Sequence, residues 1–156
     1  MIKVNSSGLN EVVKMFEGLT NETEGTMKQC VYKGAGEVAN TMKSRVEALK
    51  TQSDNKRTDV RLPYTYEKEA LIENLGIAPI QGGEVTNTKV GFDGYYTNKR
   101  GQQKPVPLLA NSINAGTSFM KKQGFINATK RAAQNPCIDA MQKQLDKVIN
   151  QLAKGE

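Results

Sequence analysis

Residues 26–50, "TMKQCVYKGAGEVANTMKSRVEALK", decide the fold of this chain. Apolar side chains recur there every three or four positions over about six turns, which is the spacing of one buried helix face. They are Met27, Cys30, Val31, Ala35, Val38, Met42, Val46 and Leu49. The pattern predicts one long amphipathic helix over about 26–50. Its small residues, Gly34 to Gly36 and Ala39, leave the helix thin, so another element is expected to pack close against it.

Two further helical regions flank this segment. Apolar residues at helical spacing predict a short helix over about 8–19, and the polar run "TNETEG" after it predicts a break. At the other end of the chain, residues 124–153 carry a second long stripe, formed by Ile138, Met141, Leu145, Val148 and Leu152. Because Asn135-Pro136 fits an N-cap followed by a first-turn proline, this region is expected to form two helices or one kinked helix.

The middle of the chain predicts shorter elements. Residues 51–65 are polar and without a period, which indicates an exposed, mobile loop, and a short helical turn is expected at about 66–74. Residues 75–93 read as two strands around a Gly82-Gly83 turn, and Pro79 makes the first an edge or bulged strand.

After the predicted sheet, residues 94–104 indicate a basic loop, expected to be a second mobile surface, and residues 105–114 a short apolar helix. The sum is an α+β fold in a single domain, 1–156. Long N- and C-terminal helices pack on a small antiparallel β-sheet.

The positive charge of the chain is concentrated in one third of it. The net charge is +6, yet no acidic residue occurs between Gly94 and Ile138. Seven cations lie there: Lys99, Arg100, Lys104, Lys121, Lys122, Lys130 and Arg131. Such a block is typical of a surface that faces a polyanion, although lysine-rich loops are also often merely solvated. No groove-reading motif accompanies it, so any DNA contact is expected to be to the phosphate backbone.

Aromatic residues lie near these cations. Tyr95, Tyr96 and Phe119 would stack on bases if they are exposed. Phe125 is instead expected in the core, because Phe125-Ile126 opens a helix.

The residue types present argue against catalysis. Histidine is absent, which removes the commonest general base, the usual nucleophile pairs and most zinc sites. Glu67, Glu69 and Glu73 have no partner acid or metal-ligand spacing, which indicates a solvated helix face. We therefore expect a non-enzymatic protein without a metal or cofactor.

Two other motifs have structural interpretations. In "NAGTS", Gly116 is expected to take a positive φ, and Thr117 or Ser118 to cap the next element, because the frame of a nucleophile elbow or a P-loop is missing. Cys30 and Cys137 fall among apolar helical positions and are expected to be buried free thiols rather than a disulfide. No apolar run approaches the length of a membrane span, and the N-terminus lacks a secretory signal pattern.

The order of several short motifs resembles the small neck or tail-completion family of long-tailed bacteriophages, often described as minor tail components. An opening "GLNEV" at 8–12 precedes the Ala-rich helix, and a strand ends in Val90-Gly91-Phe92. A short apolar helix and the turn Gly116-Thr117-Ser118 follow, with Asn114 where the family has glutamate. The next helix begins with Gly124-Phe125 in place of the family's Pro-Phe.

This resemblance implies a structural role in the virion. Members of the family resemble ring-forming subunits at the head-tail junction, stacked against a connector, tail tube or terminator, with DNA passing through the lumen without sequence specificity. It implies assembly in the bacterial host cytoplasm and no membrane contact. The residues expected to face DNA, the lumen or a partner are Lys99, Arg100, Lys104, Lys121 and Lys122. A sequence-nonspecific DNA-binding module that acts through residues 94–138 is the alternative.

Overall fold

The long helix α2, Thr20–Glu47, runs through the centre of the computed structural model, which describes residues 1–5, 20–53 and 59–154. Its predicted apolar stripe is buried, with Cys30, Val31 and Met42 fully inaccessible. The predicted start was wrong, because "TNETEG" continues the helix instead of breaking it. Exposed polar residues are compatible with a helix, and Glu24 and Lys28 form an i,i+4 ion pair of 2.7 Å there. The helix predicted over 8–19 lies outside the described residues.

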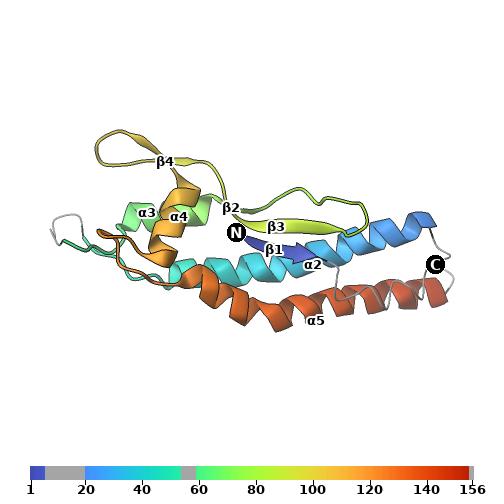
Figure 1. Cartoon of the computed structure of the whole chain (residues 1–156). Coiled ribbons are helices and arrows are strands. Elements are labelled where there is room, and N and C mark those ends of the chain that lie inside the picture. The colour runs from blue at the N-terminus through green and yellow to red at the C-terminus, as the bar shows by residue number, and fades with distance from the viewer. Residues whose placement is uncertain (6–19, 54–58, 155–156) are drawn as a thin grey trace.

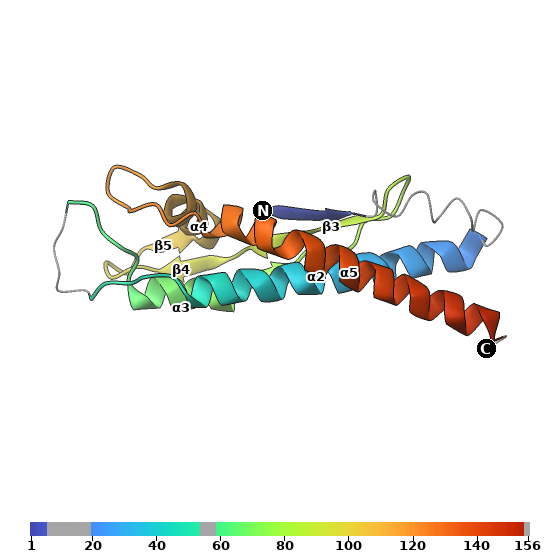
Figure 2. The same cartoon turned by 90° about the horizontal axis from the view of Figure 1, so that it is seen from below.

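A second long helix, α5, Phe125–Ala153, runs antiparallel to α2, and the two cross (Figures 1 and 2). It is one continuous helix, and Pro136 lies inside it. The expected alternative of two separate helices was therefore wrong. As predicted, α5 packs closely against the glycine-containing part of α2. A β-carbon on Gly34 would lie 2.7 Å from Met141 Cγ and 2.9 Å from Cys137 Sγ.

The buried stripe of α5 is only partly the predicted one. Met141 and Leu145 are buried, but Ile138 and Leu152 are exposed, so their assignment to the core was wrong. The approach at Gly34 turns Cys137 rather than its neighbour Ile138 toward α2, because successive helix positions differ by about 100°.

The main sheet has three antiparallel strands in the order β1-β3-β2. They are β1, Ile2–Asn5; β2, Leu75–Ile77; and β3, Asn87–Phe92. The pairing of β2 with β3 confirms the predicted strands around the Gly82-Gly83 turn, with β2 at the edge. The sequence interpretation missed β1, which pairs Ile2 with Val90 along the other side of β3.

These elements form three layers, with α2 between the sheet and α5 (Figure 1). Thr88, Val90 and Phe92 of β3 are buried, while Lys89 between them is exposed. This alternation presents one face of β3 to the core. The ring of Phe92 meets that of Phe125, at the start of α5, edge-to-face at 5.9 Å. The α+β fold, with long N- and C-terminal helices and small antiparallel sheets, is therefore confirmed.

The remaining elements gather at one end of the molecule (Figure 1). They are α3, Thr65–Glu73; β4, Tyr95–Thr97; β5, Gln103–Pro105; and α4, Val106–Ala115. The helices near 66–74 and 105–114 were predicted to within one residue. The basic loop predicted at 94–104 is wrong, because β4 and β5 pair as a two-stranded hairpin.

The expected loop 51–65 is not a free-standing loop in its described parts. Gln52 N donates to Pro63 O at 3.0 Å, and Arg61 N donates to Phe119 O at 2.9 Å. Pro63 is buried. These bonds connect the segment to itself and to the turn after α4, so its described part is only partly exposed, and its mobility stays a prediction; residues 54–58 lie outside the description.

The two cysteines are free, as predicted. Cys30 is fully buried and Cys137 half-buried, and burial raises the pKa of both thiols. Over the described ranges, no helix has the length and apolar character needed to cross a bilayer.

Candidate functional site

A cleft of about 580 Å³ opens between the β4–β5 hairpin, the start of α3, and α4 with the turn after it. Four cationic side chains contribute to its lining: Arg61, Lys99, Arg100 and Lys104. Aromatic and apolar side chains form much of the rest, among them Tyr64, Tyr66, Tyr96, Leu108, Leu109, Phe119 and Met120. The cleft therefore combines positive charge with apolar surface.

The cleft lining contains an ion pair between the partly buried Arg61 and the buried Glu67. Arg61 Nη1 donates to Glu67 Oε2 at 2.7 Å, and Arg61 Nη2 donates to Glu67 Oε1 at 2.9 Å. The Glu67 side chain is only 2% exposed, and the bond to this carboxylate raises the pKa of the Arg61 guanidinium. A bidentate pair of this kind satisfies charges that would be costly to bury alone.

Glu67 also fixes the start of α3. Its Oε2 accepts a hydrogen bond of 2.9 Å from Tyr64 N, which satisfies a backbone donor that the first turn leaves open. The expectation that Glu67 lies on a solvated face was therefore wrong. Sequence reasoning missed it because its cation partner Arg61 precedes α3 and so lies outside the helical pattern. A glutamate three residues after a helix start is a capping signal that would have singled it out.

Aromatic rings surround this pair. The guanidinium carbon of Arg61 lies 4.3 Å from the centre of the Tyr64 ring, and Lys99 Nζ lies 4.9 Å from the same centre. Tyr64 stacks on Tyr66 with centroids 5.7 Å apart, and Tyr66 reaches Tyr96 at 6.4 Å. Cations over aromatic faces keep their charge while they gain contact area, so the cleft wall remains positive.

Tyr96 connects the hairpin to this ion pair. Its hydroxyl donates to Glu67 Oε1 at 3.4 Å. Burial, followed by the nearby Glu67 charge, raises the pKa of Tyr96 to about 12. The phenol is therefore neutral at physiological pH and acts as a donor.

The hairpin turn holds two of the cations at its tip. Asn98 Oδ1 accepts hydrogen bonds of 2.9 Å from both Arg100 N and Gln102 N, and Gly101 takes a φ of +73°. Asparagine and glycine are the residues that such turns favour. The run "NKRG" at 98–101 thus carried a turn signal that the basic-loop interpretation overlooked.

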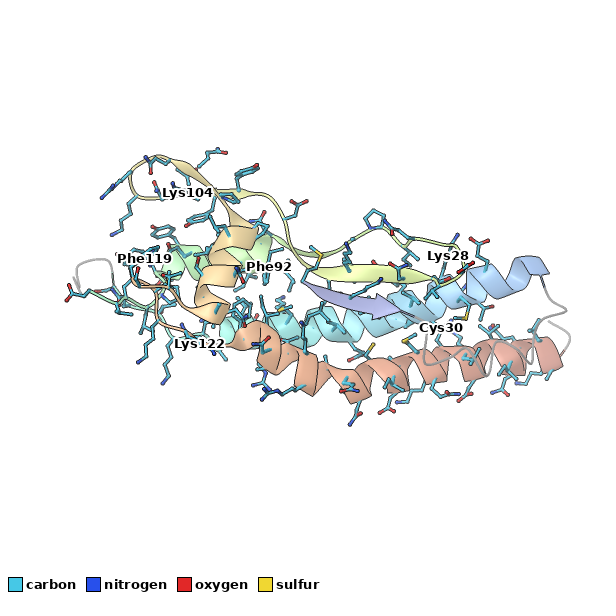
Figure 3. All side chains as sticks on the ribbon, in the orientation of Figure 1. Lys28, Cys30, Phe92, Lys104, Phe119 and Lys122 are labelled. Carbon is cyan, nitrogen blue, oxygen red and sulfur yellow. The ribbon has the colours of Figure 1, made fainter. Side chains whose placement is uncertain are left out.

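The five predicted cations divide into two groups. Lys99, Arg100 and Lys104 line the cleft. Lys121 and Lys122 are exposed outside its lining, on the segment after Phe119, where Lys121 N donates to Arg61 O at 2.9 Å. Figure 3 shows Lys104, Phe119 and Lys122 at the same end of the molecule, with Lys28 and Cys30 farther along it.

The motif residues after α4 form a turn, as predicted, but the expectation that Thr117 or Ser118 caps the next element was wrong, because α5 begins only at Phe125. Gly116 has a φ of +79°, and Thr117 Oγ1 accepts a hydrogen bond of 3.0 Å from Met120 N. Ser118 is exposed in the same turn. Gly116 is also crowded, because a β-carbon there would lie 2.9 Å from Lys122 Cβ. Glycine thus satisfies both the backbone conformation and the close approach.

The remaining motif residues connect the sheet to α5. Val90 and Phe92 are in the core, and a β-carbon on Gly91 would meet Met1 Cγ at 2.9 Å. Phe125 is buried against Phe92, as expected. Asn114 Oδ1 accepts a hydrogen bond of 3.0 Å from Ile126 N, so an α4 side chain caps the first turn of α5.

The arrangement can bind an anion through exposed cations beside an apolar wall. Its one carboxylate, Glu67, is already bonded to Arg61, Tyr64 and Tyr96. Within the described ranges, no group of three or more Cys, Asp or Glu residues could hold a metal ion. Comparison of the chain with protein-family models, with curated proteins and with solved structures found no match in any of the three.

Proposed function

We propose that this chain is a non-enzymatic structural protein of a bacteriophage virion. It assembles in the bacterial host cytoplasm into a homo-oligomeric ring at the head-tail junction, against a connector, tail tube or terminator protein, and DNA passes through the ring. The observation that carries the proposal is the ordered set of sequence motifs that resembles the neck and tail-completion family.

The positions of these motifs in the fold support the proposed resemblance, because the motifs lie where they can determine how the helices and strands are arranged. Val90-Gly91-Phe92 ends the central strand, Gly116-Thr117-Ser118 turns the chain after α4, and Phe125 joins α5 to the sheet. These three motifs lie at the end of a strand, in a turn and at the start of a helix, where one element joins the next. Short motifs at joints restrain how elements are arranged, and that arrangement is what a ring subunit must preserve.

The distribution of charge supports the passage of DNA. Lys104 and Lys122 lie at one end of an elongated molecule (Figure 3), and Lys99, Arg100 and Lys121 are on the same two segments. If this end faces the lumen, repeated subunits would surround the duplex with cations that contact phosphates without reading sequence.

Deletion of the gene from a phage or prophage genome tests the proposal. Electron microscopy of lysates should show separate heads and tails, and complementation with the intact gene should restore joined, infectious particles. Complementation with Lys143→Glu, on the exposed distal part of α5, is the matched surface control and should also restore them. Normal joined particles from the deletion strain would refute the assignment.

Sequence-nonspecific DNA binding by the isolated chain is the second candidate. It is favoured by the exposed Lys121 and Lys122, which follow Phe119, and by Lys122 lying at the same end of the molecule as Lys104 of the cationic hairpin. Fluorescence anisotropy with duplex DNA over a salt series should give a log-log slope of about −0.9 for each phosphate neutralised. The pair Lys121→Glu/Lys122→Glu should flatten that slope, whereas the control pair Lys143→Glu/Lys147→Glu should not. Absence of binding at low salt would remove this candidate.

A further inference from the structure

We propose that the cleft beside the β4–β5 hairpin is a docking site for an acidic peptide segment of a partner protein, one that carries a large apolar side chain between its carboxylates. The proposal concerns the isolated chain and does not require that it form a ring. It assigns a class of binding partner to the cleft itself, not to the exposed Lys121 and Lys122 outside its lining.

The first argument is the charge of the cleft. Of its four cations, Arg61 is neutralised by Glu67, the one carboxylate in the lining. The other three cations of the lining, Lys99, Arg100 and Lys104, lie on the hairpin side. Arg100 and Lys104 are exposed, so an occupant can reach them without breaking an internal ion pair. An occupant with several carboxylates complements this wall.

The second argument is the opposite wall. Leu108 of α4 is 59% exposed and Phe119 is 58% exposed, and both line the cleft. Figure 3 shows Phe119 at the same end of the molecule as Lys104, and both line the cleft. Large apolar side chains next to a cationic rim are the composition of a protein-binding surface, where an apolar anchor supplies contact area and charges on the rim select the partner.

The shape and chemistry favour a peptide over duplex DNA. A volume of about 580 Å³ is in the range of sites that enclose a ligand. A B-DNA duplex, whose major groove alone is about 12 Å wide, would touch only the outer rim. Phosphates also gain nothing from Leu108, whereas an apolar peptide side chain is removed from water against it.

The test is a titration of the full chain with a fluorescein-labelled peptide in which glutamates flank a central phenylalanine. Three competitors are compared: the same peptide unlabelled, its glutamine counterpart, and single-stranded oligo-dT. We expect the acidic peptide to bind and to be displaced by itself, with the glutamine counterpart at least about tenfold weaker because it lacks the charges.

Charge-reversal variants locate the site. Arg100→Glu/Lys104→Glu should weaken the acidic peptide at least about tenfold. Lys130→Glu/Arg131→Glu makes the same charge change within the basic block but off the cleft, and should have a much smaller effect. Circular dichroism melts establish that both pairs are folded, and the single variants Arg100→Glu and Lys104→Glu replace the pair if it is not.

Apolar variants test the other wall. Leu108→Gln and Phe119→Ser should each weaken the peptide several-fold, while Ile138→Gln, an equally exposed apolar position on α5, should not. Equal binding of the acidic and glutamine peptides, equal losses in the two charge-reversal pairs, or stronger displacement by oligo-dT than by the acidic peptide would each overturn the proposal. The last outcome would assign the cleft to nucleic acid.

Discussion

Gly34 of α2 and Met141 of α5 approach so closely that a β-carbon on the glycine would lie 2.7 Å from Met141 Cγ. This contact lies in the interface between the two long helices, the most extensive one between elements that the structure describes. It accounts for a glycine inside a helix, where glycine costs about 1 kcal/mol relative to alanine.

Gly34→Ala should therefore destabilise the protein although alanine is the better helix former. Met141 is buried, and Cys137 Sγ would also lie within 2.9 Å of the added carbon, so overpacking by about 1–3 kcal/mol is expected to outweigh the gain in helix propensity. Gly36→Ala is the matched control, because nothing lies within 4 Å of a β-carbon there, and it should stabilise by up to about 1 kcal/mol. Urea denaturation of the two variants measures the difference. Equal effects would show that the helices do not meet at Gly34.

Arg61→Met should lower the free energy of unfolding by about 3 kcal/mol, because it leaves the carboxylate of Glu67 buried without its cation. Arg131→Met removes an exposed cation at the start of α5 and should change stability by less than about 0.5 kcal/mol. Chemical denaturation provides the comparison. Similar losses for the two variants would mean that Glu67 finds another partner or water.

Asn114→Ala should destabilise by about 1 kcal/mol, the usual value of a lost helix cap. The amide oxygen of Asn114 is the acceptor for Ile126 N at the first turn of α5. Asn111→Ala, exposed one turn earlier on α4, is the control and should be close to neutral. Asn114→Asp should keep the acceptor and retain stability, since a carboxylate is favourable at a helix N-terminus. Thermal melts of the three variants distinguish a cap from an incidental contact.

Tyr96 should titrate well above the ordinary pKa of a tyrosine side chain. Its pKa of about 12 in the folded protein lies above the ordinary value of 10.0, so folding favours the protonated phenol. The associated stability is fully present below about pH 10 and is lost as the pH rises toward 12. A spectrophotometric titration of tyrosinate should show one late phase that Tyr96→Phe removes and Tyr95→Phe retains. A late phase that persists in Tyr96→Phe would contradict the placement of this hydroxyl.

The sequence predicted most of the helical architecture because the relevant signals are local. The period of Cys30, Val31, Val38 and Met42 fixes which face of α2 is buried, whatever packs against it. The turn at Gly116 was likewise predictable from residue type, since a positive φ favours glycine. The start of α2 was predicted six residues too late because the helix begins at Thr20, whereas its apolar period begins only at Met27.

Interactions between distant segments were decided only by the tertiary structure. β1 pairs with β3 across more than eighty residues, and two apolar residues in a four-residue strand, Ile2 and Val4, carry too little pattern to predict it. Cys137 is half-buried and its neighbour Ile138 is exposed because α5 packs against α2 at Gly34. The sequence of α5 alone does not indicate this point of contact.

The candidate site shows the same division. Its positive charge follows from the composition of residues 94–138, so the basic residues could be predicted from the sequence. Their arrangement as one wall of a cleft could not be predicted from the sequence, because it requires the hairpin to pack near α3 and Tyr96 to reach Glu67. Charge is a property of residue type, which the sequence by itself determines. Burial and proximity are properties of the packed chain. Only the tertiary structure showed that Glu67, expected as a surface acid, is the buried partner of Arg61.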